Sequence, residues 1–90
     1  MRVTVISPER SVFDGEADAM VAPAFDGQVG ILPRHAPFMT LLGKGELRIR
    51  QDEKQAGETP EATHRFHVEG GFLQVAGDVV RVVAEHAKEV

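Results

Sequence analysis

Residues 46–50 read ELRIR, so that charged residues alternate with Leu47 and Ile49. Successive side chains of a β-strand point to opposite faces of a sheet. The pattern therefore places Leu47 and Ile49 in a core and the charged residues in water, as in an antiparallel sheet with one solvated face. The same period of two resumes at Phe66 and Val68. These stretches predict half-buried strands.

The rest of the chain consists of short β-rich runs separated by turn residues, with nine glycines and five prolines among 90 residues. Expected turns include Gly70-Gly71, and Pro23 and Pro33 are expected to end strands because proline donates no backbone hydrogen bond. The polar stretch 51–63 is predicted to be a flexible hairpin loop. The predicted strands lie at residues 2–6, 12–13, 17–22, 28–32, 46–50, 66–68, 72–76 and 79–84.

This spacing of short strands predicts an all-β fold, either a sandwich or a barrel, with roughly eight to ten mostly antiparallel strands. We expect one domain at residues 1–86 and a short C-terminal tail at 87–90, because the last residues are too few for a stable isolated helix.

Composition excludes several classes of function. Ten Lys and Arg stand against 14 Asp and Glu, a net charge of −4, which disfavours binding to nucleic acid. Cysteine is absent, so disulfides, thiolate metal sites and a cysteine nucleophile are excluded. No apolar run is long enough for a spanning helix, and no signal or transit segment is visible, so we expect no direct membrane insertion and a bacterial or plastid-encoded origin.

Four stretches carry a resemblance to a known family. Residues 26–42 read DGQVGILPRHAPFMTLL, and the stretches 3–9, 45–49 and 70–75 read VTVISPE, GELRI and GGFLQV. In this order they resemble the epsilon subunit of F-type ATP synthases over nearly the whole chain, except for the polar stretch. The resemblance implies a flattened β-sandwich of about ten strands at the foot of the central stalk, between the gamma subunit and the membrane ring of c subunits.

The resemblance also implies a function. The domain would couple the c ring to gamma during proton-driven ATP synthesis, without a catalytic site, cofactor or metal of its own. It would be peripheral, on the cytoplasmic face of the bacterial inner membrane or, alternatively, the stromal face of the plastid thylakoid, and monomeric when isolated. The expected ring contacts are Gln28, Val29 and Arg34, and the expected gamma contacts are His35, Phe38, Met39 and Thr40.

Two departures from the family pattern affect this expectation. Gln28 stands where relatives commonly carry an acidic residue, and an amide gives up the charge-assisted part of a hydrogen bond, so we expect a weaker or differently paired ring contact. Relatives usually continue into two helices that can inhibit ATP hydrolysis, whereas this sequence ends at Val90. We expect no helical inhibition from these 90 residues.

Residues 38–42 lose the alternation, because Phe38, Met39, Leu41 and Leu42 are four large apolar residues within five positions. One strand face cannot bury all of them. We expect part of this set to form an exposed adhesive patch for gamma, with core packing of all four as the rival interpretation.

Other candidate sites have weaker support. His64 and His67 are three apart, which on a strand places them on opposite faces and argues against a shared metal. Ser11 could serve a small hydrolase, but it lacks a glycine-flanked elbow. Asp14, Glu16 and Asp18 alternate as on a solvated strand edge. The main alternative function is a free-standing β-sandwich that binds another protein through the loop at residues 28–38.

Overall fold

The computed structural model describes residues 1–51 and 62–90, and this part of the chain contains strands and no helix. Accordingly, no helix of the described residues is long and apolar enough to cross a membrane. The eight strands are β1 (Arg2–Ile6), β2 (Ser11–Glu16), β3 (Ala19–Ala24), β4 (Gly27–Ile31), β5 (Phe38–Leu41), β6 (Lys44–Gln51), β7 (Ala62–Ala76) and β8 (Val79–Glu89).

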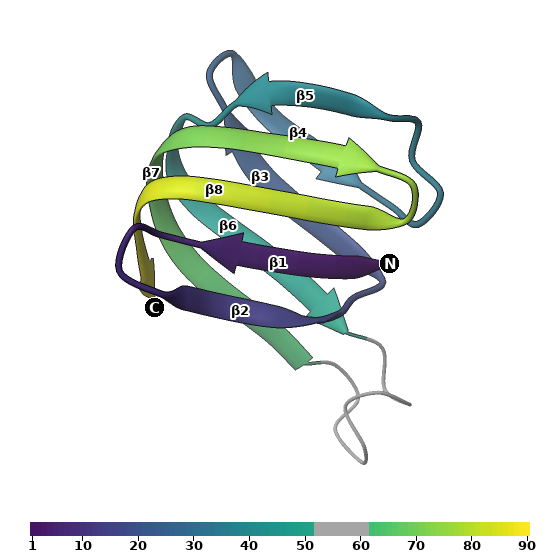
Figure 1. Ribbon diagram of the computed structural model, residues 1–90, viewed down its shortest axis with the longest axis horizontal. Helices are drawn as coiled ribbons and strands as arrows, with labels where there is room; N and C mark the ends of the chain where they lie inside the picture. Colours follow the sequence, from purple (N-terminus) through teal and green to yellow (C-terminus); the bar gives the residue numbers. More distant parts are fainter. Residues whose placement is uncertain (52–61) are drawn as a thin grey trace.

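The strands form one sheet in the order β2-β1-β8-β7-β6-β3-β4, with β5 also paired to β7. Among the described pairs, β1 and β8 run parallel and the others antiparallel. The first half of β7 pairs with β6 and its second half with β5. The long strands β7 and β8 therefore run through both layers of a sandwich and bend between them (Figure 1).

The bend lies at Gly70 and Gly71, where the sequence predicted a turn. That prediction is wrong, because β7 continues through both glycines and its pairing with β8 keeps one register from Glu69 opposite His86 to Gly71 opposite Ala84. Positive φ angles of 70° and 103° at the two glycines redirect the strand without reversing it. The connection between β5 and β6 lies beside this bend, since the Leu42 amide donates to the Gly71 carbonyl at 3.0 Å.

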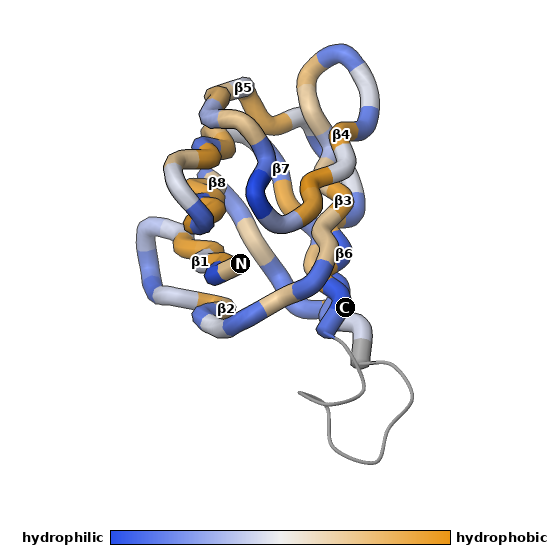
Figure 2. Tube along the Cα trace, turned by 90° about the vertical axis from the view of Figure 1, so that its right-hand side faces the viewer, coloured by the Kyte–Doolittle hydropathy of each residue, from blue (hydrophilic) through white to orange (hydrophobic). Residues whose placement is uncertain are grey.

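The core lies between the two layers and is built from the inward positions of nearly every strand. Leu47 and Ile49 are fully buried while the charged residues beside them are exposed, which confirms the alternation predicted there. Phe66 and Val68 are buried as well, with the Phe66 ring 6.0 Å from that of Phe13. Figure 2 shows the alternation as short orange and blue steps along the strands.

The all-β sandwich is confirmed, with eight strands in the described residues where the family resemblance implied about ten. Strand β8 passes Ala84 and ends at Glu89, so residues 87–89 of the expected tail pair with β7. Pro23 was expected to end a strand but lies within β3. It is tolerated because β6 pairs only with Ala19–Val21, so no β6 partner needs the missing amide. Residues 52–61 of the predicted polar loop lie outside the described residues.

Candidate partner-binding surfaces

The three expected ring contacts lie on β4 and the loop that follows it. Strand β4 is at the end of the sheet order, and on it Gln28 is exposed while Val29 is half-buried against the core. Arg34 is exposed in the loop and has a φ of 67°, in the left-handed region that non-glycine residues rarely occupy. The Arg34 amide donates a 3.2 Å hydrogen bond to a carboxylate oxygen of Asp78, in the β7–β8 turn.

The four expected gamma contacts do not share one face. Met39 is 62% exposed, whereas Phe38 and Thr40, one position away on either side, are half-buried. His35 is also half-buried, with its ring centroid 4.9 Å from that of Phe38 and its Nδ1 donating to the Ala36 carbonyl at 2.7 Å. Met39 is therefore the one of these four residues whose side chain is mostly exposed to solvent.

The four large apolar residues at 38–42 divide between the core and the surface. Leu42 is buried and Phe38 packs against the core, while Met39 and Leu41 are each 62% exposed on the outer side of β5. Core packing of all four, the rival interpretation, is thus wrong. The pairing of β5 with β7 decides the division, because it fixes which side of the strand meets the opposite layer.

Strand pairing places Leu41 in a row of apolar side chains that crosses the layer formed by β5, the second half of β7, β8 and β1. Leu41 pairs with Phe72 of β7, Phe72 with Val83 of β8, and Val83 with Ile6 of β1. Phe72, Val83 and Ile6 are half-buried, out of phase with their fully buried neighbours. We call Leu41, Phe72, Val83 and Ile6 the outer apolar row. Sequence reasoning missed its last three members, although their places out of phase with Leu73, Val82 and Val5 are a usable signal.

The outer apolar row borders a shallow hollow of about 430 Å³. Apart from Ser7 and Glu85 its lining residues are apolar: Ile6, Pro8, Gly71, Phe72, Val83 and Ala84. A contiguous apolar surface on a small protein is typical of a protein–protein contact. The hollow would accept an apolar side chain of a partner.

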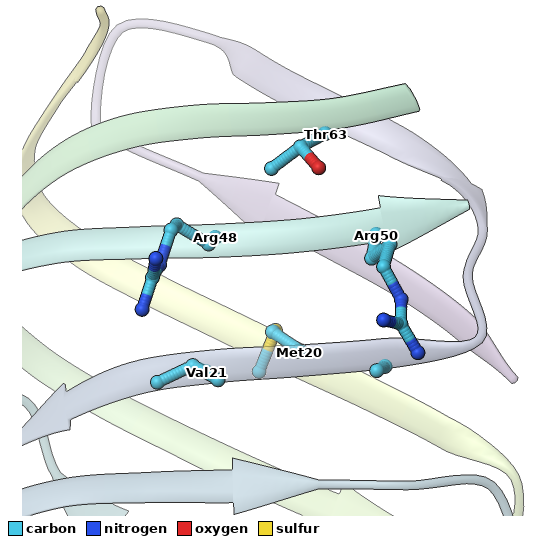
Figure 3. Close-up of a pocket in the computed structure, with 6 residues that line it drawn as sticks. Met20, Val21, Arg48, Arg50 and Thr63 are labelled. Carbon is cyan, nitrogen blue, oxygen red and sulfur yellow. The ribbon is translucent and has the colours of Figure 1, made fainter. Parts of the chain in front are cut away.

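The opposite layer has a basic outer face. Arg48 on β6 is paired directly with Arg65 on β7, and a hollow of about 300 Å³ beside them is lined by Arg48, Arg50, Thr63 and residues of β3. Figure 3 shows Arg48 and Arg50 extending from β6 toward β3. Glu46 offsets part of this charge, with a carboxylate oxygen 3.6 Å from Arg48 Nε. The sequence showed Arg48 and Arg50 as neighbours, but Arg65 joins them only through strand pairing.

The remaining candidates lie apart from one another. His64 is half-buried against the Phe13 ring and His67 is exposed, as their odd separation predicted. Across residues 1–51 and 62–90, His, Cys, Asp and Glu form no group of three able to hold a metal. The hollow beside Ser11 is lined by Arg10, Ser11, Val12 and Glu89, without a histidine. Asp14 forms a 2.8 Å ion pair with Arg2, and Glu16 is exposed.

Comparison with solved structures matches the fold to components of ATP synthases. A chain of the mitochondrial ATP synthase of Euglena gracilis superposes with a TM-score of 0.80 at 20% identity, over 97% of this chain and 51% of that one. A chain of the Tetrahymena thermophila mitochondrial ATP synthase, in a structure of its central stalk and c ring, gives 0.71 at 20% identity, over 97% and 64%. At this identity the likeness shows the fold alone.

Sequence comparison identifies the family. The ATP synthase epsilon chain of Leptospira borgpetersenii is 41% identical over 86 residues, which are 96% of this chain and 61% of the relative. That of Caulobacter vibrioides is 37% identical over 89 residues, 99% of this chain and 94% of the relative. The chain spans less than two thirds of several relatives, 61% and 58% for those of Leptospira borgpetersenii and Nitrosococcus oceani. The family model for the ATP synthase delta/epsilon chain β-sandwich domain matches residues 1–90, and the chain belongs to that family.

Proposed function

We propose that this chain is a non-catalytic rotor subunit of an F-type ATP synthase that couples the c ring to the gamma subunit. It would work on the cytoplasmic face of a bacterial inner membrane. Membership of the epsilon family supports the proposal, and so does the similarity of the fold to ATP synthase chains. The observation that carries it is the outer apolar row, which crosses four strands of one face.

The outer apolar row suits a permanent contact with gamma. Phe72 and Val83 lie on strands whose alternate residues, Leu73 and Val82, are fully buried. The row is therefore held in place by the core, so its side chains lose little conformational freedom when a partner covers them. A specific interface buries about 800 Å² on each partner, and this row with Met39 would lie near its centre.

The ring contact would use a different part of the molecule. Gln28 is exposed on β4, and the loop that carries Arg34 follows that strand. The Gln28 amide and the Arg34 guanidinium group would both be able to form hydrogen bonds with polar groups of the ring. We propose that β4 and this loop meet the ring while the outer apolar row meets gamma. A stiff sandwich between two partners would transmit torque.

Capture of purified gamma tests the proposal. We expect nanomolar-range binding by the wild-type chain and a loss of at least about tenfold for Leu41→Asp, which places a charge within the apolar contact. Val90→Asp is the matched control, because Val90 is 67% exposed and pairs with Arg65 at the far end of the sheet. It should bind gamma as the wild type does.

One result would overturn the rotor role, and another would overturn only the part of the outer apolar row in it. Failure of a folded wild-type chain to bind gamma would overturn it and favour the alternative of a free-standing binding module that uses residues 28–38. Equal loss of binding by Leu41→Asp and Val90→Asp would remove the outer apolar row from the contact, because the effect would then follow from added charge at any site.

A further inference from the structure

Asp78 connects three segments that are distant in sequence. It lies in the turn between β7 and β8, after Gly77, whose φ is 61°. Its backbone carbonyl accepts a 2.9 Å hydrogen bond from the amide of Arg2, at the start of β1. One carboxylate oxygen, Oδ2, lies 3.6 Å from the amino group of Met1. The β7–β8 turn is therefore held at the start of β1 independently of the contact that Asp78 makes with the loop at residues 32–37.

The other carboxylate oxygen, Oδ1, accepts the 3.2 Å hydrogen bond from the amide of Arg34, 44 residues away. The loop at residues 32–37 has proline at positions 33 and 37, and the His35 amide donates to the Leu32 carbonyl at 3.2 Å. In the part of the chain that the structure describes, Arg34 is the one non-glycine residue with a positive φ. Such a conformation persists only when surrounding contacts hold it, and Asp78 supplies a contact from outside the loop.

We infer that Asp78 is a positioning residue, which holds the backbone of Arg34 in the shape that meets the c ring. The inference rests on the proposed function, since it assumes that the loop is a ring contact. The hydrogen bond from the Arg34 amide to Asp78 Oδ1 fixes the Arg34 backbone from outside the loop. Without it the turn would sample other conformations, and each binding event would have to order the loop again.

Binding to a detergent-solubilised c ring tests this role, with amide hydrogen exchange at Arg34 as an independent readout. Asp78→Ala should bind the ring about fivefold more weakly and expose the Arg34 amide to faster exchange, as expected for the loss of one hydrogen bond at the surface. Asp78→Asn loses the charge near Met1 but keeps an oxygen acceptor for the Arg34 amide. Because the hydrogen bond is retained, its binding should stay within about twofold of wild type. Asp14→Ala is the matched control, because it removes another exposed carboxylate that is in an ion pair.

The outcomes separate this inference from the proposed function. If the wild-type chain does not bind the ring, the proposed ring contact is overturned, and the role of Asp78 in it falls as well. If the wild type binds and Asp78→Ala binds equally well, only the role of Asp78 is overturned. Weak binding by both Asp78→Asn and Asp78→Ala would also overturn it, since the charge would then matter and not the hydrogen bond. Loss of binding in proportion to global unfolding would do the same.

Discussion

Replacing Gly71 with alanine would test whether the bend in β7 sets the shape of the sandwich. Gly71 has a φ of 103°, which side chains rarely tolerate. A Cβ there would overlap the carbonyl oxygen of Val83 and come within 2.9 Å of the Ala84 Cα. Both obstacles are backbone atoms of the adjacent strand, so no side chain can rotate away. The added methyl group must therefore push β8 from β7 or force β7 into another path.

The expected cost combines two terms. The disfavoured φ contributes about 1–3 kcal/mol, and overpacking against backbone contributes about 1–3 kcal/mol more. A domain of 90 residues has a total free energy of unfolding of roughly 5–13 kcal/mol. Gly71→Ala should thus remove a large fraction of the stability. Gly77→Ala is the matched control, because Gly77 has a φ of 61° and nothing within 4 Å of the added Cβ, so only about 1–2 kcal/mol is expected.

Urea unfolding followed by circular dichroism would measure both variants, with the free energy obtained by linear extrapolation. We expect Gly71→Ala to be the less stable of the two by at least about 1 kcal/mol. It should also bind gamma poorly, because the outer apolar row crosses the strands beside the bend. A Gly71→Ala variant as stable as Gly77→Ala would refute the close approach of β7 and β8 on which the argument depends.

Three further predictions concern single side chains. Met39→Asp should weaken gamma binding about tenfold or more without loss of fold, as measured by surface capture, and unchanged binding would exclude Met39 from the contact. Gln28→Glu should tighten binding to the c ring and make it more sensitive to salt, because a carboxylate forms charge-assisted hydrogen bonds with basic groups; a titration in rising salt would show it. Phe66→Ala should lower the free energy of unfolding by about 3–5 kcal/mol in urea, since the ring is fully buried.

Local patterns in the sequence were sufficient for the elements that one strand decides alone. The alternation at Leu47 and Ile49 placed both in the core, because a strand with one covered face buries every second residue. The Gly70-Gly71 pair was misread as a turn because glycine permits a reversal and a bend equally. Only the presence of β8 alongside, in unbroken register, shows that the strand continues.

The candidate surfaces were harder to predict because they also depend on which strands lie side by side. The sequence showed that residues 38–42 hold too many large apolar side chains for one face, but pairing with β7 decides that Met39 and Leu41 are the exposed ones. The outer apolar row and the neighbouring Arg48 and Arg65 likewise depend on register between strands. Contacts across strands are non-local, so a single sequence without its pairing cannot place them.

The sandwich joins its two proposed contacts through one hydrogen-bonded ladder. The outer apolar row is carried by β5, β7, β8 and β1, and from β7 the pairing continues through β6 and β3 to β4, where Gln28 lies. Force applied at the row would reach β4 across strand pairs, without passing through a flexible linker. Damage to the shared core should therefore weaken both contacts together, whereas a charge at Leu41 should weaken only the contact with gamma. A Phe66→Ala variant that loses one contact and keeps the other would mean that the two surfaces do not depend on a common rigid body.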